Sequence, residues 1–212
     1  MISMLIMILR YGTKLVKTLF FNVAFKISWL VTFIKFKLNG VNFNNDFKAR
    51  GVPIINVNLK GIINIRSGFM MHSGKYYNMI GRQQRCYFIV GKDAVLNIGE
   101  NVGISSTALI CYNKIDIEDH VRIGGGVVIY DTDFHSLNLD ERIQNPEVTT
   151  NIKSSPVVIK RGAFIGAHSI ILKGVTIGQN SIIGAGSVVV KSIPENEIWA
   201  GNPAKKIRDL VS

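Results

Sequence analysis

Three side chains near the middle of the chain could carry out acid–base chemistry, those of Asp131, Asp133 and His135. Imidazole has an ordinary pKa close to neutral pH, so it can take up a proton and release it again during a reaction. A neighbouring carboxylate can hold one imidazole tautomer and stabilise the charged ring that forms. These residues therefore have the ingredients of a general base, with His135 as the base and Asp131, Asp133 or a main-chain carbonyl to orient its ring.

These three residues open a polar segment, residues 131–157, that interrupts an otherwise regular repeat. Two chain breakers lie within it, Asn145-Pro146 and Ser155-Pro156. Connections longer than about 12 to 15 residues are uncommon inside compact domains, and those that occur are usually functional. We therefore expect an extruded loop here, with His135 at its base.

Aliphatic residues recur at every sixth position after this segment, at Ile159, Ile165, Ile171, Ile177, Ile183 and Val189. In a helix, residues six apart are rotated by about 240° net, so these side chains would point to three different sides. In one long strand, the glycines and small residues between them would interrupt the pairing repeatedly. The pattern instead predicts a short strand and a turn in each hexad, wound into a solenoid with the aliphatic side chains inside.

The same period is present before the loop, but it slips. Its aliphatic positions fall into three runs: Val90 and Leu96; Ile98, Ile104 and Ile110; and Ile117, Ile123 and Ile129. The slips predict small bulges. Further upstream, the alternation of Ile55, Val57 and Leu59 predicts the strands of an opening coil. Residues 70–89 lose the period, so they form either an irregular first coil or a loop whose aromatic and Arg side chains face a glycan.

The N-terminal 50 residues are apolar and basic, with eight Lys or Arg residues against one acid, Asp46. We expect an amphipathic helix in this segment. Because Lys26 interrupts the apolar run of residues 18–34, a helix that crosses a membrane is not expected. Two interpretations remain. Residues 1–38 either lie in a headgroup layer with their cations against anionic lipid, or cap one end of the solenoid.

Composition narrows the classes of function. The chain has 212 residues, 47% of them hydrophobic, which is typical of one globular domain with an appendage. Its two cysteines, Cys86 and Cys111, predict no disulfide framework, and with the lack of a signal-peptide cleavage pattern they indicate the cytoplasm. Cys111 is expected as a packed thiol. The net charge of +11 lies largely in an apolar segment without a stacking aromatic surface, so nucleic acid is not expected as a partner.

The repeat resembles that of the hexapeptide-repeat acyltransferases, in particular the sugar and polysaccharide O-acetyltransferases. The residues that carry the resemblance are Ile165-Gly166, Ile177-Gly178, the run of residues 183–189 and the ending Ala-Gly-Asn-Pro-Ala-Lys-Lys-Ile-Arg at residues 200–208. The match covers about residues 90–208. It implies a mainly β fold, a left-handed parallel β-helix over residues 51–203. We expect the amphipathic helical segment over residues 1–50 to precede it and a short C-terminal helix over residues 204–212 to follow it.

The resemblance also implies roles for individual residues. A catalytic His stands at the start of such a loop in the family, which matches His135, and a carboxylate that touches the acceptor in some relatives matches Asp119. The co-substrate would be acetyl-CoA. The residues that match its contacts are Ala167 and Ala185 through backbone groups, Val190 and Lys191 near the pantetheine arm, and Lys205 and Arg208 at the phosphates. The alternative for the last two is a solvated basic tail. Val190 stands where the family often has Thr, so a hydroxyl contact is lost.

The resemblance implies a homotrimer in which a groove between neighbouring copies holds acetyl-CoA. A zinc-binding branch of the same fold uses three histidines, but the spacing of His120, His135 and His168 does not resemble that branch, so no metal is expected. The function expected is direct transfer of an acetyl group from acetyl-CoA to a hydroxyl of a sugar or surface glycan, in the cytoplasm or at the inner membrane face. Two alternatives stay open, N-acetylation of an amino-sugar nucleotide and a non-catalytic β-helix scaffold.

Overall fold

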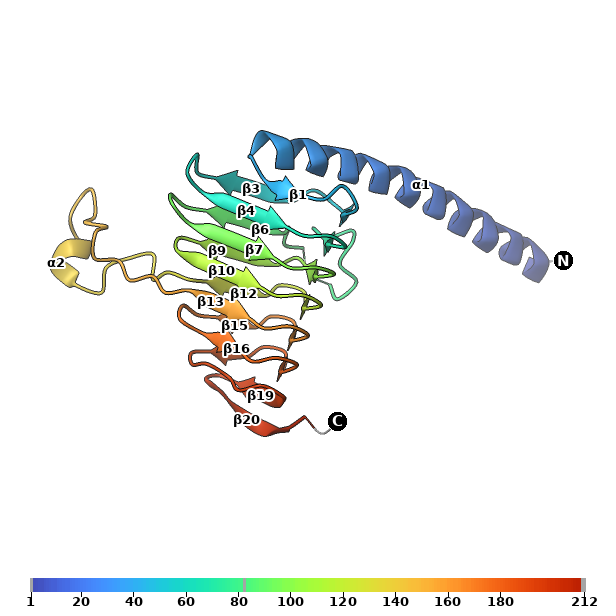
Figure 1. The fold of residues 1–212 in the computed structure, drawn as a ribbon. Helices are drawn as coiled ribbons and strands as arrows, with labels where there is room; N and C mark the ends of the chain where they lie inside the picture. The colour runs from blue at the N-terminus through green and yellow to red at the C-terminus, as the bar shows by residue number, and fades with distance from the viewer. Residues whose placement is uncertain (1, 82, 211–212) are drawn as a thin grey trace.

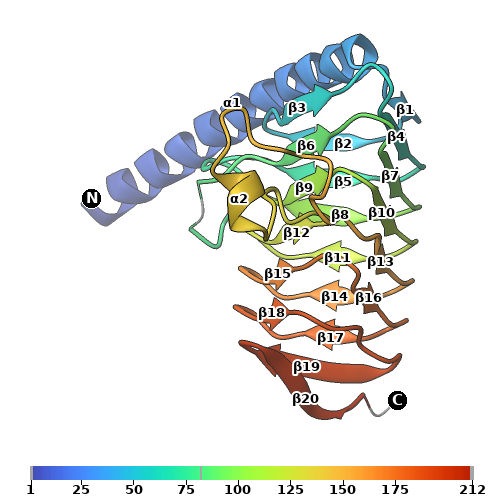
Figure 2. The same cartoon turned by 90° about the vertical axis from the view of Figure 1, so that its left-hand side faces the viewer.

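The structure, a computed structural model, describes residues 2–81 and 83–210. It is a three-sided β-helix with a long helix, α1 (Ile2–Leu38), across its N-terminal end and a loop projecting from one side (Figure 1). Three columns of short strands form the three faces, and Figure 2 shows them side by side. Every pairing between neighbouring coils is parallel, and the single antiparallel strand pair among the described strands is the last one, β19 with β20.

Each face is one sheet. The first sheet contains β1 (Asn42–Phe43), β4 (Ile62–Ile65), β7 (Val95–Ile98), β10 (Lys114–Ile117), β13 (Val157–Ile159) and β16 (Thr176–Ile177). The second contains β2 (Lys48–Arg50), β5 (Met70–His72), β8 (Gly103–Ser105), β11 (Arg122–Ile123), β14 (Phe164–Ile165), β17 (Ile182–Ile183), β19 (Glu197–Gly201) and β20 (Ala204–Asp209). The third contains β3 (Ile54–Val57), β6 (Tyr87–Val90), β9 (Ala108–Cys111), β12 (Val128–Tyr130), β15 (Ile170–Ile171) and β18 (Val188–Val189).

The hexad aliphatics point to the axis, as predicted. Ile159 pairs with Ile177, Ile165 with Ile183 and Ile171 with Val189, so each stacks on the residue one coil later. All six are at most 1% exposed. Each such side chain contributes roughly 1.5 to 3 kcal/mol by burial, so this stack anchors the C-terminal half of the core.

One predicted hexad position is wrong by a residue. Leu109, not Ile110, pairs with Ile129 and is fully buried, while Ile110 pairs with Tyr130 and is partly exposed. The cause is the turn after Ile104, which is one residue shorter than the turn between the paired Ile123 and Ile129. A shift of one residue along a strand moves a side chain from one face to the other.

The β-helix also begins earlier than residue 51. Strands β1 and β2 lie before Gly51 and pair with β4 and β5, so α1 ends at Leu38 and a first coil follows it directly. Leu59 does not belong to a strand. Strand β3 ends at Val57, and the Leu59 side chain is fully exposed in the turn after it.

The expected C-terminal helix is not present. Residues Ala204–Asp209 form β20, which folds back on β19, with Ala200 opposite Lys205 and Trp199 opposite Lys206. Gly201 has φ +103°, a conformation that glycine adopts readily, and this turn reverses the chain. The hairpin covers the edge of the last coil, which would otherwise leave its backbone groups unpaired.

The C-terminal half of α1 closes the other end of the solenoid. Phe36 is 1% exposed and its ring lies 5.3 Å from that of Phe47 and 6.2 Å from that of Phe88 in the core. The Trp29 ring stacks on Phe47 at 5.6 Å, and its indole N–H donates to the Phe47 carbonyl at 3.2 Å. The capping interpretation is therefore correct for this half of the helix.

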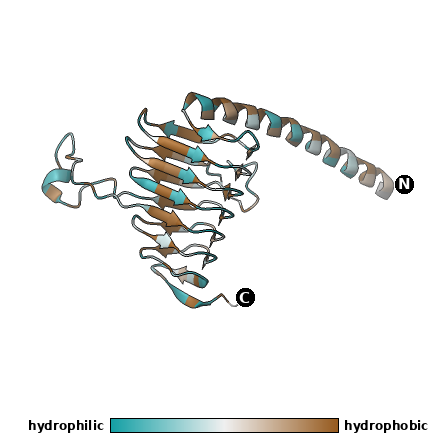
Figure 3. Ribbon diagram, in the orientation of Figure 1, coloured by the Kyte–Doolittle hydropathy of each residue, from teal (hydrophilic) through white to brown (hydrophobic). Residues whose placement is uncertain are grey.

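The N-terminal half of α1 extends past the β-helix into open space (Figure 1). Every described side chain from Met4 to Phe20 is exposed, and Figure 3 shows hydrophobic residues along this projecting part. By length and composition, Met4–Leu38 is long and apolar enough to cross a membrane. The capping contacts lie at its C-terminal end, and the exposed first half packs against none of the other residues that the structure describes.

Candidate active site

The loop that follows β12 leaves the solenoid at the corner between the third and first sheets (Figure 1). Its two ends run side by side, because Thr132 and Ser154 form an antiparallel bridge and the Asp133 N–H donates to the Lys153 carbonyl at 3.0 Å. The Ser155 N–H donates to the Asp131 carbonyl at 2.8 Å. This short stem carries the loop outward and returns the chain to β13.

His135 lies just beyond the stem and is paired with Glu147. Its Nδ1 is 2.7 Å from Glu147 Oε2, and the other carboxylate oxygen accepts the Ser136 N–H at 2.8 Å. An ionised carboxylate can only accept, which assigns the proton to Nδ1 and leaves Nε2 as the basic nitrogen. The His135 hydrogen bond, followed by the Ser136 N–H, holds the pKa of Glu147 below its ordinary value. The side chain of His135 is 68% exposed, so Nε2 is open to a substrate.

Neither aspartate that we predicted as the orienting group reaches His135. Asp131 is fully buried, and its two oxygens accept the N–H groups of Tyr112 at 2.7 Å and Asn113 at 2.8 Å. Asp133 forms an ion pair with Lys173 at 2.8 Å. Both carboxylates are used to join the loop stem to the coils above and below it, and the orienting role falls to Glu147.

A network inside the loop holds Glu147 in place. The chain turns through α2 (Leu139–Arg142), whose N-terminus is capped by Asn138, with Asp140 N–H donating to the amide oxygen at 2.9 Å. Ser136 is buried, and its hydroxyl donates to Glu141 at 2.5 Å while its carbonyl accepts from Arg142 at 2.7 Å. The charge-assisted bonds in this network are of the stronger kind. The loop therefore holds its shape largely through its own contacts.

Phe134, the residue before His135, packs the start of the loop against the solenoid. Its ring meets Tyr130 edge-on at 5.2 Å and Tyr112 at 6.1 Å. Its φ is +65°, an uncommon value for a non-glycine residue. Phe134 therefore faces the coils while the next residue, His135, points away from them.

The expected acetyl-CoA residues lie on two other parts of the solenoid. Ala167 and Ala185 stack at the corner between the second and third sheets, where the Gly186 N–H donates to the Ala167 carbonyl at 2.8 Å. This corner is tight, since a Cβ on Gly166 would lie 2.5 Å from the Ala185 nitrogen. The result is a narrow ladder of backbone groups along the axis, a surface suited to an extended ligand.

The remaining expected residues are spread further. Val190 and Lys191 share the corner of the loop, where the Lys191 ammonium lies 5.1 Å from the centre of the Trp199 ring. Lys205 and Arg208 are exposed on β20. Within one chain, the structure does not bring His135 to Ala167 and Ala185, because they occupy opposite edges of the third sheet.

Asp119 lies at the third corner, between the first and second sheets. Its Oδ1 accepts the Glu100 N–H at 2.7 Å, and its carbonyl accepts the Gly162 N–H at 3.0 Å. These contacts join three successive coils. Asp119 and His135 therefore lie at different corners of one chain, and the contact of Asp119 with an acceptor stays a prediction.

Both thiols are buried, which is the arrangement expected of packed and not of nucleophilic cysteines. Burial raises the pKa of Cys86 to about 12. Burial first, and then the negative charge of Asp131, raise the pKa of Cys111. Among the residues that the structure describes, no three His, Cys, Asp or Glu side chains are grouped so that they could hold a metal ion.

The solenoid defines the fold class, a left-handed parallel β-helix of six-residue repeats with one histidine-bearing loop. Residues 156–191 match the family model of the bacterial transferase hexapeptide (six repeats). The chain is similar to a putative acetyltransferase of Saccharomyces cerevisiae, 37% identical over 130 residues, which covers 58% of this chain and 63% of that protein. It is also similar to the galactoside O-acetyltransferase of Escherichia coli, 36% identical over 115 residues, covering 53% and 56%. The chain thus spans less than two thirds of both relatives.

Among solved structures, AntD, an N-acyltransferase from Bacillus cereus in complex with dTDP and coenzyme A, is similar with a TM-score of 0.59 and 25% identity, covering 80% of this chain and 83% of that chain. The resemblance to the hexapeptide-repeat acyltransferases and the left-handed β-helix predicted from the sequence are both confirmed. Sequence reasoning missed Glu147. The sequence signal that could have indicated Glu147 is the chain breaker Asn145-Pro146 directly before it, which predicts a turn of the chain.

Proposed function

We propose that this protein transfers an acetyl group from acetyl-CoA to a hydroxyl of a sugar or surface glycan. The observation that carries the proposal is the His135–Glu147 pair on a loop extruded from a hexapeptide-repeat solenoid. The names of the relatives support it, because one is a galactoside O-acetyltransferase and a structural neighbour holds coenzyme A.

The chemistry is a direct transfer. His135 Nε2 takes the proton of the acceptor hydroxyl while the oxygen attacks the thioester carbonyl. The C–S bond then breaks, coenzyme A leaves as a thiolate, and the imidazolium returns its proton to that sulfur. Glu147 stabilises the charged ring through the Nδ1 contact at 2.7 Å. Holding both substrates together supplies much of the acceleration, and no covalent enzyme intermediate is required.

A homotrimer would complete this site. His135 and the Ala167–Ala185 ladder lie at different corners of one chain, so three copies around an axis could place the loop of one copy beside the ladder of the next. Val190 and Lys191 would then meet the pantetheine arm, and Lys205 and Arg208 would neutralise its phosphates. Sedimentation equilibrium tests this assembly, and a monomer at catalytic concentration would contradict it.

The decisive experiment compares His135→Ala with His120→Ala, a matched change at an exposed turn of the same solenoid. Release of coenzyme A from acetyl-CoA is followed with a galactoside, maltose and isolated surface glycans as acceptors. We expect His135→Ala to lose roughly 100-fold or more of the rate and His120→Ala to keep it. Full activity of His135→Ala would remove the mechanism.

N-acetylation is a second candidate reaction, because AntD is an N-acyltransferase with dTDP in its structure. N-acetylation of an amino-sugar nucleotide would form an amide, whereas the favoured reaction forms an ester. Mild base removes the acetyl group from an ester and leaves an amide intact, so product analysis separates them. A non-catalytic scaffold is the third possibility, and a melting temperature unchanged by acetyl-CoA would support it.

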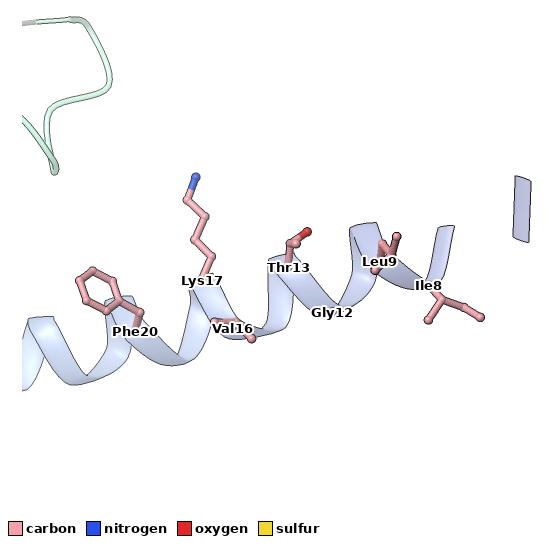
Figure 4. Close-up of a pocket in the computed structure, with 7 residues that line it drawn as sticks. All are labelled: Ile8, Leu9, Gly12, Thr13, Val16, Lys17 and Phe20. Carbon is pink, nitrogen blue, oxygen red and sulfur yellow. The ribbon is translucent and has the colours of Figure 1, made fainter. Parts of the chain in front are cut away.

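We further propose that the protein is cytoplasmic and that the free half of α1 lies on the inner membrane face. Arg10, Lys14 and Lys17 follow one another at helical spacings of four and three, so they form one basic stripe. Figure 4 shows Lys17 and Ile8 pointing to different sides of the helix, and their neighbours Leu9, Val16 and Phe20 are exposed. Each cation at the centre of a bilayer costs about 2.5 to 3.5 kcal/mol or more, which favours an interfacial helix over a spanning one.

Sedimentation with anionic vesicles tests the membrane contact. Reversing two charges by Arg10→Glu and Lys14→Glu should release the protein from vesicles of phosphatidylglycerol, whereas the control Arg66→Glu, on an exposed turn of the solenoid, should not. Equal binding of the two variants would reject this contact.

A further inference from the structure

A cleft of about 750 Å³ lies between α1 and the irregular segment of residues 73–81, at the corner of the solenoid that carries Ala167 and not at the corner of the His135 loop of the same chain. The helix contributes Phe21, Asn22 and Phe25 to its wall, and the strands below contribute Arg50, His72 and Ser105. The opposite wall is the irregular segment itself, with Tyr76, Tyr77, Asn78, Met79 and Ile80. The sequence pattern left residues 70–89, which include this segment, open between an irregular coil and a glycan-facing loop.

The irregular segment is held firmly on both sides of the cleft. Asn78 is 7% exposed and its amide donates to the Ser106 hydroxyl at 2.8 Å. Tyr77 meets Phe21 of the helix edge-on at 6.1 Å. A Cβ on Gly125 would lie 2.5 Å from Ile80, so the segment sits directly on this corner of the solenoid. The cleft is therefore a built feature of the fold.

The charge inside the cleft is positive and free of acidic partners. Lys17 and Arg50 are its charged residues, and no Asp or Glu is among the described residues that line it. Both cations lie over aromatic rings, Lys17 at 5.8 Å from the centre of Phe21 and Arg50 at 6.0 Å from that of Phe25. Neither forms an ion pair within residues 2–81 and 83–210. Two such cations suit a phosphate group, to which Arg donates in a bidentate manner.

The rim of the cleft is apolar and aromatic. Met79 is fully exposed, and Ile80 and Tyr76 are more than half exposed, although large apolar side chains are usually buried. This rim continues into the exposed apolar surface of α1, which contributes Lys17 both to the cleft and to the groove along the helix. A ligand that fits must therefore combine an anionic group with an apolar chain, and the tyrosines offer flat surfaces for a sugar ring.

We propose that this cleft binds the acceptor of the reaction as a sugar phosphate carried on an apolar chain, and that in the proposed trimer the acceptor faces His135 of the neighbouring copy. Lys17 and Arg50 hold the phosphate, Tyr76 and Tyr77 contact the sugar, and the chain runs along Met79 and Ile80 toward α1. This inference rests on the proposed acetyl transfer for its biological meaning, but binding in the cleft is measured without acetyl-CoA.

Calorimetry of the full chain with octyl phosphate tests the site, with inorganic phosphate and dihexanoyl phosphatidylglycerol as competing sources of phosphate. Octyl phosphate should bind saturably, and Lys17→Gln or Arg50→Gln should each weaken it about tenfold or more. Arg66→Gln, which removes one positive charge from an exposed turn elsewhere, should change the affinity less than twofold. Lys17 lies on the exposed half of α1, so its replacement leaves the folded core untouched.

Three results would overturn the proposal. Equal weakening by Arg66→Gln would mean that net charge, and not the cleft, attracts the ligand. Inorganic phosphate binding as tightly as octyl phosphate would mean that the apolar rim is unused. The two-chain lipid binding as tightly, with the same response to Arg50→Gln, would assign the cleft to membrane headgroups. If octyl phosphate binding depends on Arg50 but the protein transfers no acetyl group, the result contradicts the proposed function while the proposed binding site stands.

Discussion

His135 Nδ1 lies 2.7 Å from Oε2 of Glu147, a carboxylate twelve residues further along the chain. The two meet because α2 turns the loop back on itself and because the second oxygen of Glu147 accepts the Ser136 N–H at 2.8 Å. The contact selects the tautomer with a free Nε2 and keeps the ring in one orientation.

Replacing Glu147 by Gln should lower kcat by roughly 10- to 100-fold and leave the affinity for acetyl-CoA within about twofold, because the amide still fits but cannot balance the charge of the imidazolium. Steady-state kinetics with the melting temperature as a check on folding measure this. Glu195→Gln, at an exposed turn, is the matched control and should behave as the unmodified protein. Unchanged kcat in Glu147→Gln would show that Glu147 has no positioning role.

The loop should loosen in acid before the solenoid does. Hydrogen bonds from His135 and Ser136 lower the pKa of Glu147, and those from Ser136 and Asn151 lower that of Glu141, both from an ordinary value of 4.5. A lowered folded-state pKa means that the stabilisation is present above pH 4.5 and is lost as pH falls through the folded pKa, below 4.5. Hydrogen exchange of residues 131–156 between pH 7 and pH 3 should show protection lost there first. Constant protection across this range would contradict the expectation.

Asp131→Asn should destabilise the fold more than Asp133→Asn does. Asp131 is fully buried and accepts two backbone N–H groups, so one of them loses its acceptor and meets an amide donor, at a cost of about 1 to 3 kcal/mol. The ion pair of Asp133 with Lys173 is partly exposed and contributes about 1 kcal/mol or less. Urea midpoints of the two variants measure the difference. Equal midpoints would mean that Asp131 does not hold the stem.

Phe36→Ala should lower the free energy of unfolding by about 3 to 5 kcal/mol, because it leaves a cavity where α1 meets Phe47 and Phe88. Leu38→Ala is the control two residues away, and since Leu38 is 81% exposed its effect should stay within about 0.5 kcal/mol. Denaturant unfolding followed by tryptophan fluorescence, to which Trp29 and Trp199 both contribute, compares them. A small effect of Phe36→Ala would mean that the helix does not cap the core.

Neither thiol should react with a disulfide reagent in the folded protein at pH 8. Burial raises the pKa of Cys86 to about 12 and raises that of Cys111 as well, and the thiolate is the reactive form. Both should react after unfolding in urea, and this reaction gives the total number of thiols for comparison. Rapid modification of the native protein would show that one of these thiols is accessible.

The solenoid could be predicted from the order of residues because its signal is local and repeated. Aliphatic side chains six residues apart each bury against the next coil, so the spacing of Ile159, Ile165 and Ile171 already contains the geometry of the core. The loop was predictable for the same reason, as the place where the spacing stops. The error at Ile110 arose where one turn is a residue shorter than its neighbours, a difference that only the pairing of Leu109 with Ile129 shows.

The contacts of the site depended on how distant segments meet in space. Asp131 and Asp133 are close to His135 along the chain, yet the coils beside the stem take both carboxylates, through Tyr112, Asn113 and Lys173. Glu147 reaches the imidazole because a hydrogen-bonded loop folds it back. The cleft beside α1 is likewise lined by residues that are far apart in the sequence, from Lys17 to Ser105. The buried side chains of successive coils contact one another at a constant interval along the sequence, so the spacing alone predicts their burial. A hydrogen bond depends on atomic positions that the whole fold must first bring together.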